Sequence, residues 1–405
     1  MVRIAIIIGL LVGAGTTSAA EPDWLQSLRA REAKPTKTEE VRSPDGWFRA
    51  SVPANPLGKV ESEGGSYSLA FELAPGIQVS CELIRDGFDP ASLLSKTAIT
   101  SFELLEKAQG KIALRAVERT DAGRFDSSPF IAVDWLYRVD TPEGPKVGSL
   151  KQVAALKDGH GVYCAQNDVG YSKSFEALVR AFVQSLQVKD PPAPGIYEDI
   201  SVVSFGGAKV GIATSAVSRD KDGDLRVQTS TAILLPVTSD TLRAQDEFNV
   251  QFVRPDGTLI NALNVTASNG EIEADLKLDP LQDGGWQVSG QYKGKALEGR
   301  LEGEHAPTTM LQQAAVRKAL LARPDPVGGE NVEWQWIATD PLRLTEARLK
   351  VVGTAGEGLY KAHESAGPMQ ADSVLERATG FTQRVDMTLG PLAVTVERIY
   401  ARGGF

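Results

Sequence analysis

Catalysis near neutral pH usually depends on a histidine, an activated nucleophile or a metal ion, so the three histidines come first. His160, His305 and His363 each lack a second histidine three or four residues away, which is the spacing of a metal-ligand pair. The chain also lacks a G-x-S-x-G elbow, an S-x-x-K motif with its companion motifs and a phosphate-binding G-x-x-x-x-G-K-S/T loop. We therefore predict solvated surface histidines, no catalytic residue, no metal, no cofactor and no enzyme activity.

Two groups of carboxylates have spacings that also occur at functional sites. The segment from Asp220 to Asp224 carries three aspartates at alternate positions, as a calcium loop does, but Thr231 stands where that loop needs a bidentate glutamate. Glu271, Glu273 and Asp275 could act as the paired carboxylates of a glycosidase, yet they alternate with apolar residues. We predict a hairpin turn for the first group and the solvent face of a strand for the second.

Three tryptophans provide a hypothesis for ligand binding. Trp334 and Trp336 alternate along one predicted strand and therefore share a face, and Trp286 begins another strand. Large aromatic side chains on the concave face of a curved sheet suit an acyl chain or a peptide. Core packing is the alternative, because contacts between a sheet and a helix need the same residue types.

The first twenty residues have the organisation of a cleavable signal peptide. Arg3 supplies a positive charge, residues 4–12 are apolar and residues 18–20 are small. The apolar run is shorter than a transmembrane helix, which disfavours a membrane anchor, and Glu21 stands where a lipid anchor would need cysteine. We predict an exported mature chain that starts at Glu21 and is periplasmic or secreted, as in a Gram-negative bacterium.

The two cysteines suit an oxidising compartment. Cys81 and Cys164 each lie within a strand-like run, and an even number of cysteines in an exported chain favours pairing. We predict a disulfide between them, with two buried thiols as the alternative. A redox-active pair is not expected, because the chain has no C-x-x-C motif.

Composition disfavours several classes of partner. The formal net charge is −9, and removal of residues 1–20, whose one charged residue is Arg3, makes it −10. An acidic chain is poorly suited to bind nucleic acid or anionic lipid.

No later run reaches 18 uninterrupted apolar residues, so no integral membrane segment is predicted after cleavage. Phe405 resembles the last residue of an outer-membrane barrel, but Glu397 interrupts the apolar alternation that such a strand needs.

A proline-rich segment divides the mature chain into two predicted domains. Residues 189–196 contain three prolines and a glycine, which favour a stiff, exposed spacer. Residues 21–44 are polar and are predicted to be flexible. The predicted organisation is a signal peptide at 1–20, a flexible polar segment at 21–44, a first domain at 45–188, the linker at 189–196 and a second domain at 197–405.

The first domain shows strands, a helix from Asp89-Pro90, more strands and a closing helix. The opening residues from Pro44 to Pro53 and the closing helix that begins at Ser174-Phe175 resemble the PsbP-like α/β/α fold. This resemblance implies an α/β/α domain on an antiparallel sheet. The family consists mostly of binding and assembly modules, so it brings no catalytic residues to this chain.

The second domain is predicted to be mostly strands with one helix. The hairpin from Trp286 to Leu301, the helix from Thr308 to Ala322 and the two strands that follow resemble the half-barrel of periplasmic lipid and lipoprotein carriers. The resemblance implies a curved antiparallel sheet with one packed helix. The predicted fold class of the whole chain is therefore α+β.

These observations predict a non-enzymatic exported binding protein whose second domain carries or senses a lipid, a lipoprotein or another apolar ligand. One alternative is a cell-envelope assembly or scaffolding factor that acts through protein contacts. Another is a hydrolase with an unrecognised site. The expected partner is a lipid or an envelope protein, and the oligomeric state is left open.

Overall fold

A computed structural model of the chain describes residues 23–34, 37–85, 94, 100–107, 110–189, 195–303 and 305–404. The predicted signal peptide, its cleavage point before Glu21, most of the linker at 189–196, most of the helix from Asp89-Pro90 and Phe405 lie outside these residues. Contacts divide the chain into two compact units. The N-terminal unit contains the described residues up to 189 and residues 234–244, and the C-terminal unit contains residues 195–233 and 245–404.

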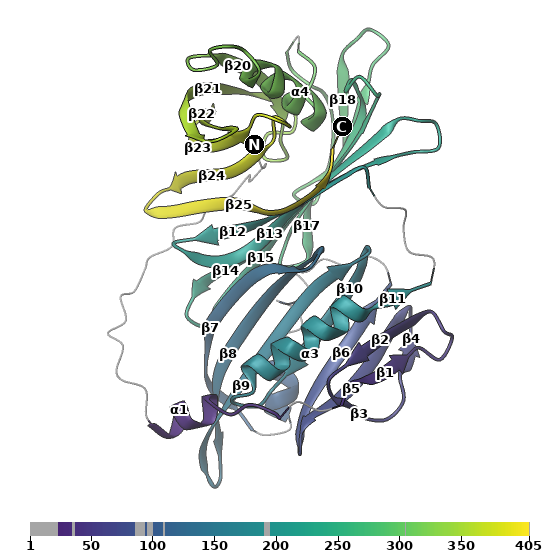
Figure 1. The fold of residues 1–405 in the computed structure, drawn as a ribbon, viewed down its shortest axis with the longest axis vertical. Helices are drawn as coiled ribbons and strands as arrows, with labels where there is room; N and C mark the ends of the chain where they lie inside the picture. The colour runs from purple at the N-terminus through teal and green to yellow at the C-terminus, as the bar shows by residue number, and fades with distance from the viewer. Residues whose placement is uncertain are drawn as a thin grey trace. The chain divides into compact units, whose positions relative to one another are not determined.

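The N-terminal unit is built on two antiparallel sheets (Figure 1). The smaller sheet has the order β1 (Glu39–Arg42), β2 (Phe48–Val52), β11 (Gln187–Val188). The larger has the order β3 (Asn55–Pro56), β5 (Ser66–Ala74), β6 (Ile77–Ile84), β10 (His160–Gln166), β9 (Gly144–Lys157), β8 (Ser128–Thr141), β7 (Ile112–Phe125), with β4 (Glu61–Glu63) paired to β5. The β9–β10 hairpin turns at Asp158 and Gly159, whose φ angles of 51° and 80° suit a two-residue hairpin turn.

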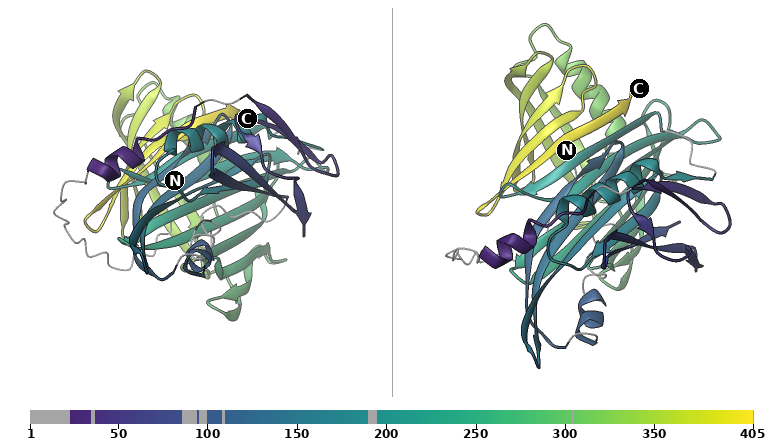
Figure 2. Two further views of the ribbon diagram at one scale, coloured as in Figure 1. Left: turned by 90° about the horizontal axis from the view of Figure 1, so that it is seen from below. Right: turned by 60° about the horizontal axis from the view of Figure 1, so that its bottom comes forward.

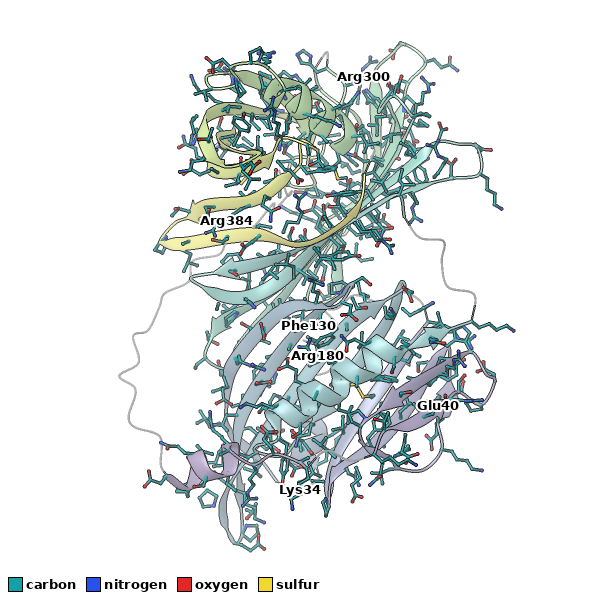
Figure 3. All side chains as sticks on the ribbon, in the orientation of Figure 1. Lys34, Glu40, Phe130, Arg180, Arg300 and Arg384 are labelled. Atoms are coloured by element: carbon teal, nitrogen blue, oxygen red, sulfur yellow. A yellow bond between two sulfur atoms is a disulfide. The ribbon has the colours of Figure 1, made fainter. Side chains whose placement is uncertain are left out.

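Helix α3 (Ser172–Ser185) covers one face of the larger sheet (Figure 1). Its buried residues recur at helical spacing and are Phe175, Leu178, Val179, Phe182 and Val183. They share a core with strand residues such as Phe71 and Val162. At its edge Arg180 lies 4.9 Å above the ring of Phe125, which stacks on Phe130 with ring centroids 4.3 Å apart (Figure 3). The apolar face of α3 therefore covers this core.

The polar segment that precedes the first domain contains ordered elements. It includes α1 (Asp23–Arg29) and β1. Glu32 accepts hydrogen bonds from the backbone N–H groups of Lys173 and Ser174, in the first turn of α3. These amides have no partner within a helix, so Glu32 supplies the cap that Tyr171 at the N-cap does not.

The predicted disulfide between Cys81 and Cys164 is confirmed (Figure 3). Cys81 lies on β6 and Cys164 on β10, and the two residues are directly opposite in the antiparallel register. Their Cα atoms are 4.1 Å apart. The bond therefore joins two neighbouring strands beneath α3.

The C-terminal unit is one fourteen-stranded sheet with a helix. The strands that precede the helix in the chain are β12 (Tyr197–Phe205), β13 (Ala208–Arg219), β14 (Leu225–Thr238), β15 (Thr241–Val253), β16 (Leu259–Ser268), β17 (Glu271–Pro280), β18 (Trp286–Tyr292) and β19 (Lys295–Arg300). The others are β20 (Glu330–Trp336), β21 (Leu344–Gly356), β22 (Leu359–Ala366), β23 (Met369–Glu376), β24 (Thr382–Leu389) and β25 (Leu392–Gly403). Strand β12 pairs with β25, so β19 and β20 form the two ends of the sheet.

The sheet curls around helix α4 (Met310–Leu321), and its two ends meet the segment between β19 and α4 (Figures 1 and 2). In that segment Glu302 donates its backbone N–H to Leu342 O, and Thr308 donates its backbone N–H to Trp334 O on β20. Thr309 caps α4 by accepting from Gln312 N. The residues between β19 and α4 thus pair with the far end of the sheet.

The predicted α+β class is wrong, because strands make up 61% of the structure and helices 12%, in three antiparallel sheets. Strands β7, β8 and β9 have 14 residues each, so strands dominate the first domain. That domain contains two sheets and is not an α/β/α sandwich on a single sheet. Instead of a half-barrel with a packed helix, the C-terminal unit has a sheet whose ends are bridged around α4.

Within the described part of the chain, no helix is long and apolar enough to cross a membrane.

Candidate functional site

The structure places the three predicted binding tryptophans in different surroundings. Trp336 is 1% exposed, lies in the apolar core and donates its Nε1–H to Pro341 O at 2.9 Å. Trp286 is partly buried and packs against the same core. Trp334 instead stacks on His305, with ring centroids 4.1 Å apart. None of the three lines the interior cavity described below.

The carboxylates and histidines considered in the sequence analysis form local hydrogen bonds or lie on the surface of a strand. Asp220 accepts hydrogen bonds from the backbone N–H groups of Asp222 and Asp224, which folds the β13–β14 turn. His160 contacts Arg85 O through Nδ1, and His363 contacts Asp372 through Nδ1. On β17, Glu271 and Asp275 are exposed and Glu273 is half-buried; Ala274 and Leu276 are buried, whereas Ile272 is exposed. Within the described residues, no group of three or more His, Cys, Asp or Glu is arranged to hold a metal ion.

An interior cavity of about 100 Å³ lies between α4 and the inner faces of β12 to β15. Alternate residues of a strand share a face, so these four strands each present polar side chains to α4. The polar residues that line it include Asp199, Ser215, Thr231, Glu247, Asn249 and Gln251. The opposite wall contains Gln313 and Arg317 of α4 and Phe381 before β24. The lining is hydrogen-bonding in character, whereas the predicted site was aromatic.

Asn249 is the most informative residue of this cavity. It is 3% exposed, and its Nδ2 atom has no hydrogen-bond partner within the described residues. Its neighbour Gln251 does have a partner, because its Oε1 accepts the backbone N–H of Met310 at 3.2 Å. An unpaired buried amide N–H costs about 1–3 kcal/mol. Asn249 therefore presents an unused donor to the cavity.

Two carboxylates line the same cavity. Asp199 Oδ2 accepts the hydroxyl of Tyr197 at 2.7 Å, and Glu247 Oε1 accepts Nδ2 of Asn264 at 3.2 Å. Burial raises the pKa of Asp199, while hydrogen bonds from Tyr197 and Ser215 act in the opposite direction. The cavity is therefore a region where negative charge is poorly solvated.

Arg317, which lines the cavity, also belongs to a buried ion cluster. Arg317 is 2% exposed and makes two hydrogen bonds to Glu333, at 2.8 and 3.0 Å. It also contacts Glu364 at 3.3 Å and donates to Thr382 Oγ1 at 3.2 Å. Burial disfavours the charged guanidinium, but the charges of Glu364 and Glu333 outweigh it and raise the pKa of Arg317. One guanidinium thus faces two buried carboxylates.

No family model matches the chain, and no curated protein matches it. Among solved structures, the chain is similar to a β-barrel-like protein of a domain of unknown function, DUF1849, from Brucella abortus. The TM-score is 0.39 at 12% sequence identity, and the match covers 51% of this chain and 96% of that chain.

A second cavity, of about 390 Å³, lies in the N-terminal unit beside Lys151. Lys151 is 4% exposed and donates to three neutral oxygens, namely Ser149 Oγ, Gln166 Oε1 and the backbone oxygen of Asp168. No carboxylate among the described residues forms an ion pair with it. Burial lowers the pKa of Lys151 to about 8, although the charges of Asp134 and Asp168 act in the opposite direction. Lys151 is therefore a buried cation held by neutral acceptors.

This lysine predicts how stability depends on pH. Between pH 8 and 10.5 the unfolded chain keeps the Lys151 proton and the folded chain has lost it, so the free energy of unfolding should rise with pH. From pH 8 to 9.5 this contribution is about 2 kcal/mol. Urea unfolding of Lys151→Met at these two pH values should lack this rise, whereas Lys146→Met, at an exposed position on the same strand, should keep it. Equal pH dependence in the two variants would contradict the assignment.

Proposed function

We propose that the protein is a non-enzymatic, exported binding protein of the cell envelope whose C-terminal unit receives its ligand in the interior cavity. The disulfide between Cys81 and Cys164, together with the absence of a membrane-spanning helix within the described residues, supports export. The observation that carries the binding proposal is the unpaired, buried Nδ2 of Asn249 in a cavity lined by polar side chains.

The size and lining of the cavity support a small polar ligand group. Ligand pockets for drug-sized molecules span about 300–1,000 Å³, and this cavity is about 100 Å³. Its lining includes hydroxyls, amides and carboxylates, such as those of Thr231, Asn249 and Asp199. A lipid or a lipoprotein would thus be recognised through a polar group that enters the cavity. An acyl chain would leave these polar side chains without partners.

Native mass spectrometry of the exported, folded full chain tests this proposal. The wild-type protein should carry a co-purifying molecule, and Asn249→Leu should lose at least nine-tenths of it, because leucine removes the donor and fills the space. Asn261→Leu is the matched control, since Asn261 lies on the neighbouring strand β16 and does not line the cavity. No bound molecule in the wild type, or equal loss in both variants, would contradict the proposal.

A further inference from the structure

Asn249 lies opposite a second amide that is also incompletely paired. Its register partner on β16 is Asn264, so the two side chains share one face of the sheet. Asn264 is fully buried, and its Nδ2 donates to Glu247 at 3.2 Å, but its Oδ1 has no hydrogen-bond partner within the described residues. The Cβ atoms of directly opposed residues are about 4.5–5.5 Å apart. An unused donor, on Asn249, and an unused acceptor, on Asn264, therefore lie side by side at the β15 wall of the cavity.

The donor on Asn249 restricts the charge of a complementary ligand. Arg317 is the cation among the described lining residues, and Glu333 and Glu364 already hold it. An anionic ligand would therefore find no free positive charge in this lining. An ammonium carries hydrogen-bond donors and no acceptor, so it cannot use the N–H of Asn249. The best complement is a neutral group whose oxygen accepts from Asn249 and whose N–H donates to Asn264.

The rest of the cavity indicates what such a group is attached to. Three residues of the lining are apolar at the cavity wall, namely Met310, Ala314 and Phe381. The volume of about 100 Å³ has room for about three groups the size of a water molecule. A methyl, a carbonyl and an N–H make up three such groups. The amide of a peptide backbone continues into chain on both sides, and a cavity of this size does not enclose it.

We propose that the cavity binds an acetamido group, in which a methyl, a carbonyl and an N–H follow one another. The carbonyl oxygen accepts the N–H of Asn249, the amide N–H donates to Oδ1 of Asn264, and the methyl contacts the apolar lining. The inference rests on the proposed function of the cavity and adds the chemical class of the ligand. This group occurs both in N-acetylated amino sugars and in small N-acetylated amines.

NMR titration of the isotope-labelled full chain with matched probes tests the inference. The wild-type protein should bind N-methylacetamide at least 5-fold more tightly than methyl acetate, which has the same shape but lacks the N–H. Asn249→Ala removes the donor without filling the cavity and should weaken N-methylacetamide at least 10-fold. Asn261→Ala, on β16 and outside the cavity lining, is the control and should bind as the wild type does.

A variant of the second amide separates its role from that of Asn249. Asn264→Leu removes the acceptor and should bind N-methylacetamide and methyl acetate equally, with its circular dichroism spectrum confirming that it is folded. Equal binding of the two probes by the wild type, an unchanged preference in folded Asn264→Leu, or no binding of N-methylacetamide would overturn the inference.

Sugar probes distinguish the two sources of the group. Binding of N-acetyl-D-glucosamine at least 10-fold more tightly than N-methylacetamide, with no binding of D-glucose, assigns an amino sugar. Binding of N-methylacetamide at least as tight as that of the sugar assigns a small acetylated amine. If the molecule that co-purifies in a manner dependent on Asn249 has no acetamido group, the ligand class fails while the proposed function stands.

Discussion

Replacing Arg317 by methionine should lower the free energy of unfolding by about 3–5 kcal/mol. The loss arises because Glu333 and Glu364, both buried, would keep their negative charges without the guanidinium between them. Methionine restores most of the packing volume of the side chain, so the effect measures the missing charge rather than a cavity. Urea unfolding followed by circular dichroism provides the measurement.

Two further variants separate this effect from a general loss of packing. Adding Glu333→Leu and Glu364→Leu to Arg317→Met should recover most of the lost stability, because no buried charge then remains unpaired. Arg384→Met breaks an exposed ion pair with Asp386, in which the side chains are 45% and 43% exposed (Figure 3), and should cost less than about 1 kcal/mol. A loss in Arg384→Met as large as that in Arg317→Met would refute the special role of the buried cluster.

Replacing both cysteines by alanine should destabilise the N-terminal unit by about 4–5 kcal/mol. The bond closes a loop between residues 83 positions apart, and a long loop is strongly restricted by a cross-link in the unfolded chain. Because each unit has its own core, calorimetry should show the N-terminal transition at a lower temperature and the C-terminal transition unchanged.

A reductant provides the control for the disulfide. Dithiothreitol should lower the N-terminal transition of the wild-type protein and leave Cys81→Ala/Cys164→Ala unaffected. If the reductant shifts the double variant as much as the wild type, the stabilisation does not come from this bond.

Local patterns predicted local features of this chain. The disulfide was predicted from the even number of cysteines and from the strand-like runs around Cys81 and Cys164. The structure places these two residues opposite each other on neighbouring antiparallel strands. The helix predicted from Thr308 to Ala322 lies within two residues of α4 at each end, because Pro307-Thr308 and Arg323-Pro324 mark its limits, although the N-cap is Thr309. The pairing of strands into sheets was not predictable in this way. The pairing of β12 with β25 depends on contacts between residues far apart in the chain.

The cavity between α4 and β12 to β15 was not predicted, for a related reason. The predicted ligand site was based on large tryptophans, whereas the cavity is lined mainly by polar side chains from four strands. Only the pairing of those strands brings these side chains together. One sequence signal was present. On β15, the alternate residues Glu247, Asn249 and Gln251 precede the buried Val253, which indicates a strand face that changes from polar to apolar along the chain. Polar side chains on an inward face are costly unless they find hydrogen-bond partners, so this pattern marks a site that sequence analysis could examine.

The pairing of β12 with β25 also has a consequence for how the C-terminal unit folds. Glu198 and Arg402 hydrogen-bond across this pair although they are 204 residues apart. The first strand of the unit cannot complete its hydrogen bonds until the last strand has been synthesised, and such long-range closure is slow. We therefore expect the enclosure of α4 by the sheet to form late and the C-terminal unit to fold more slowly than a sheet of hairpin-paired strands alone.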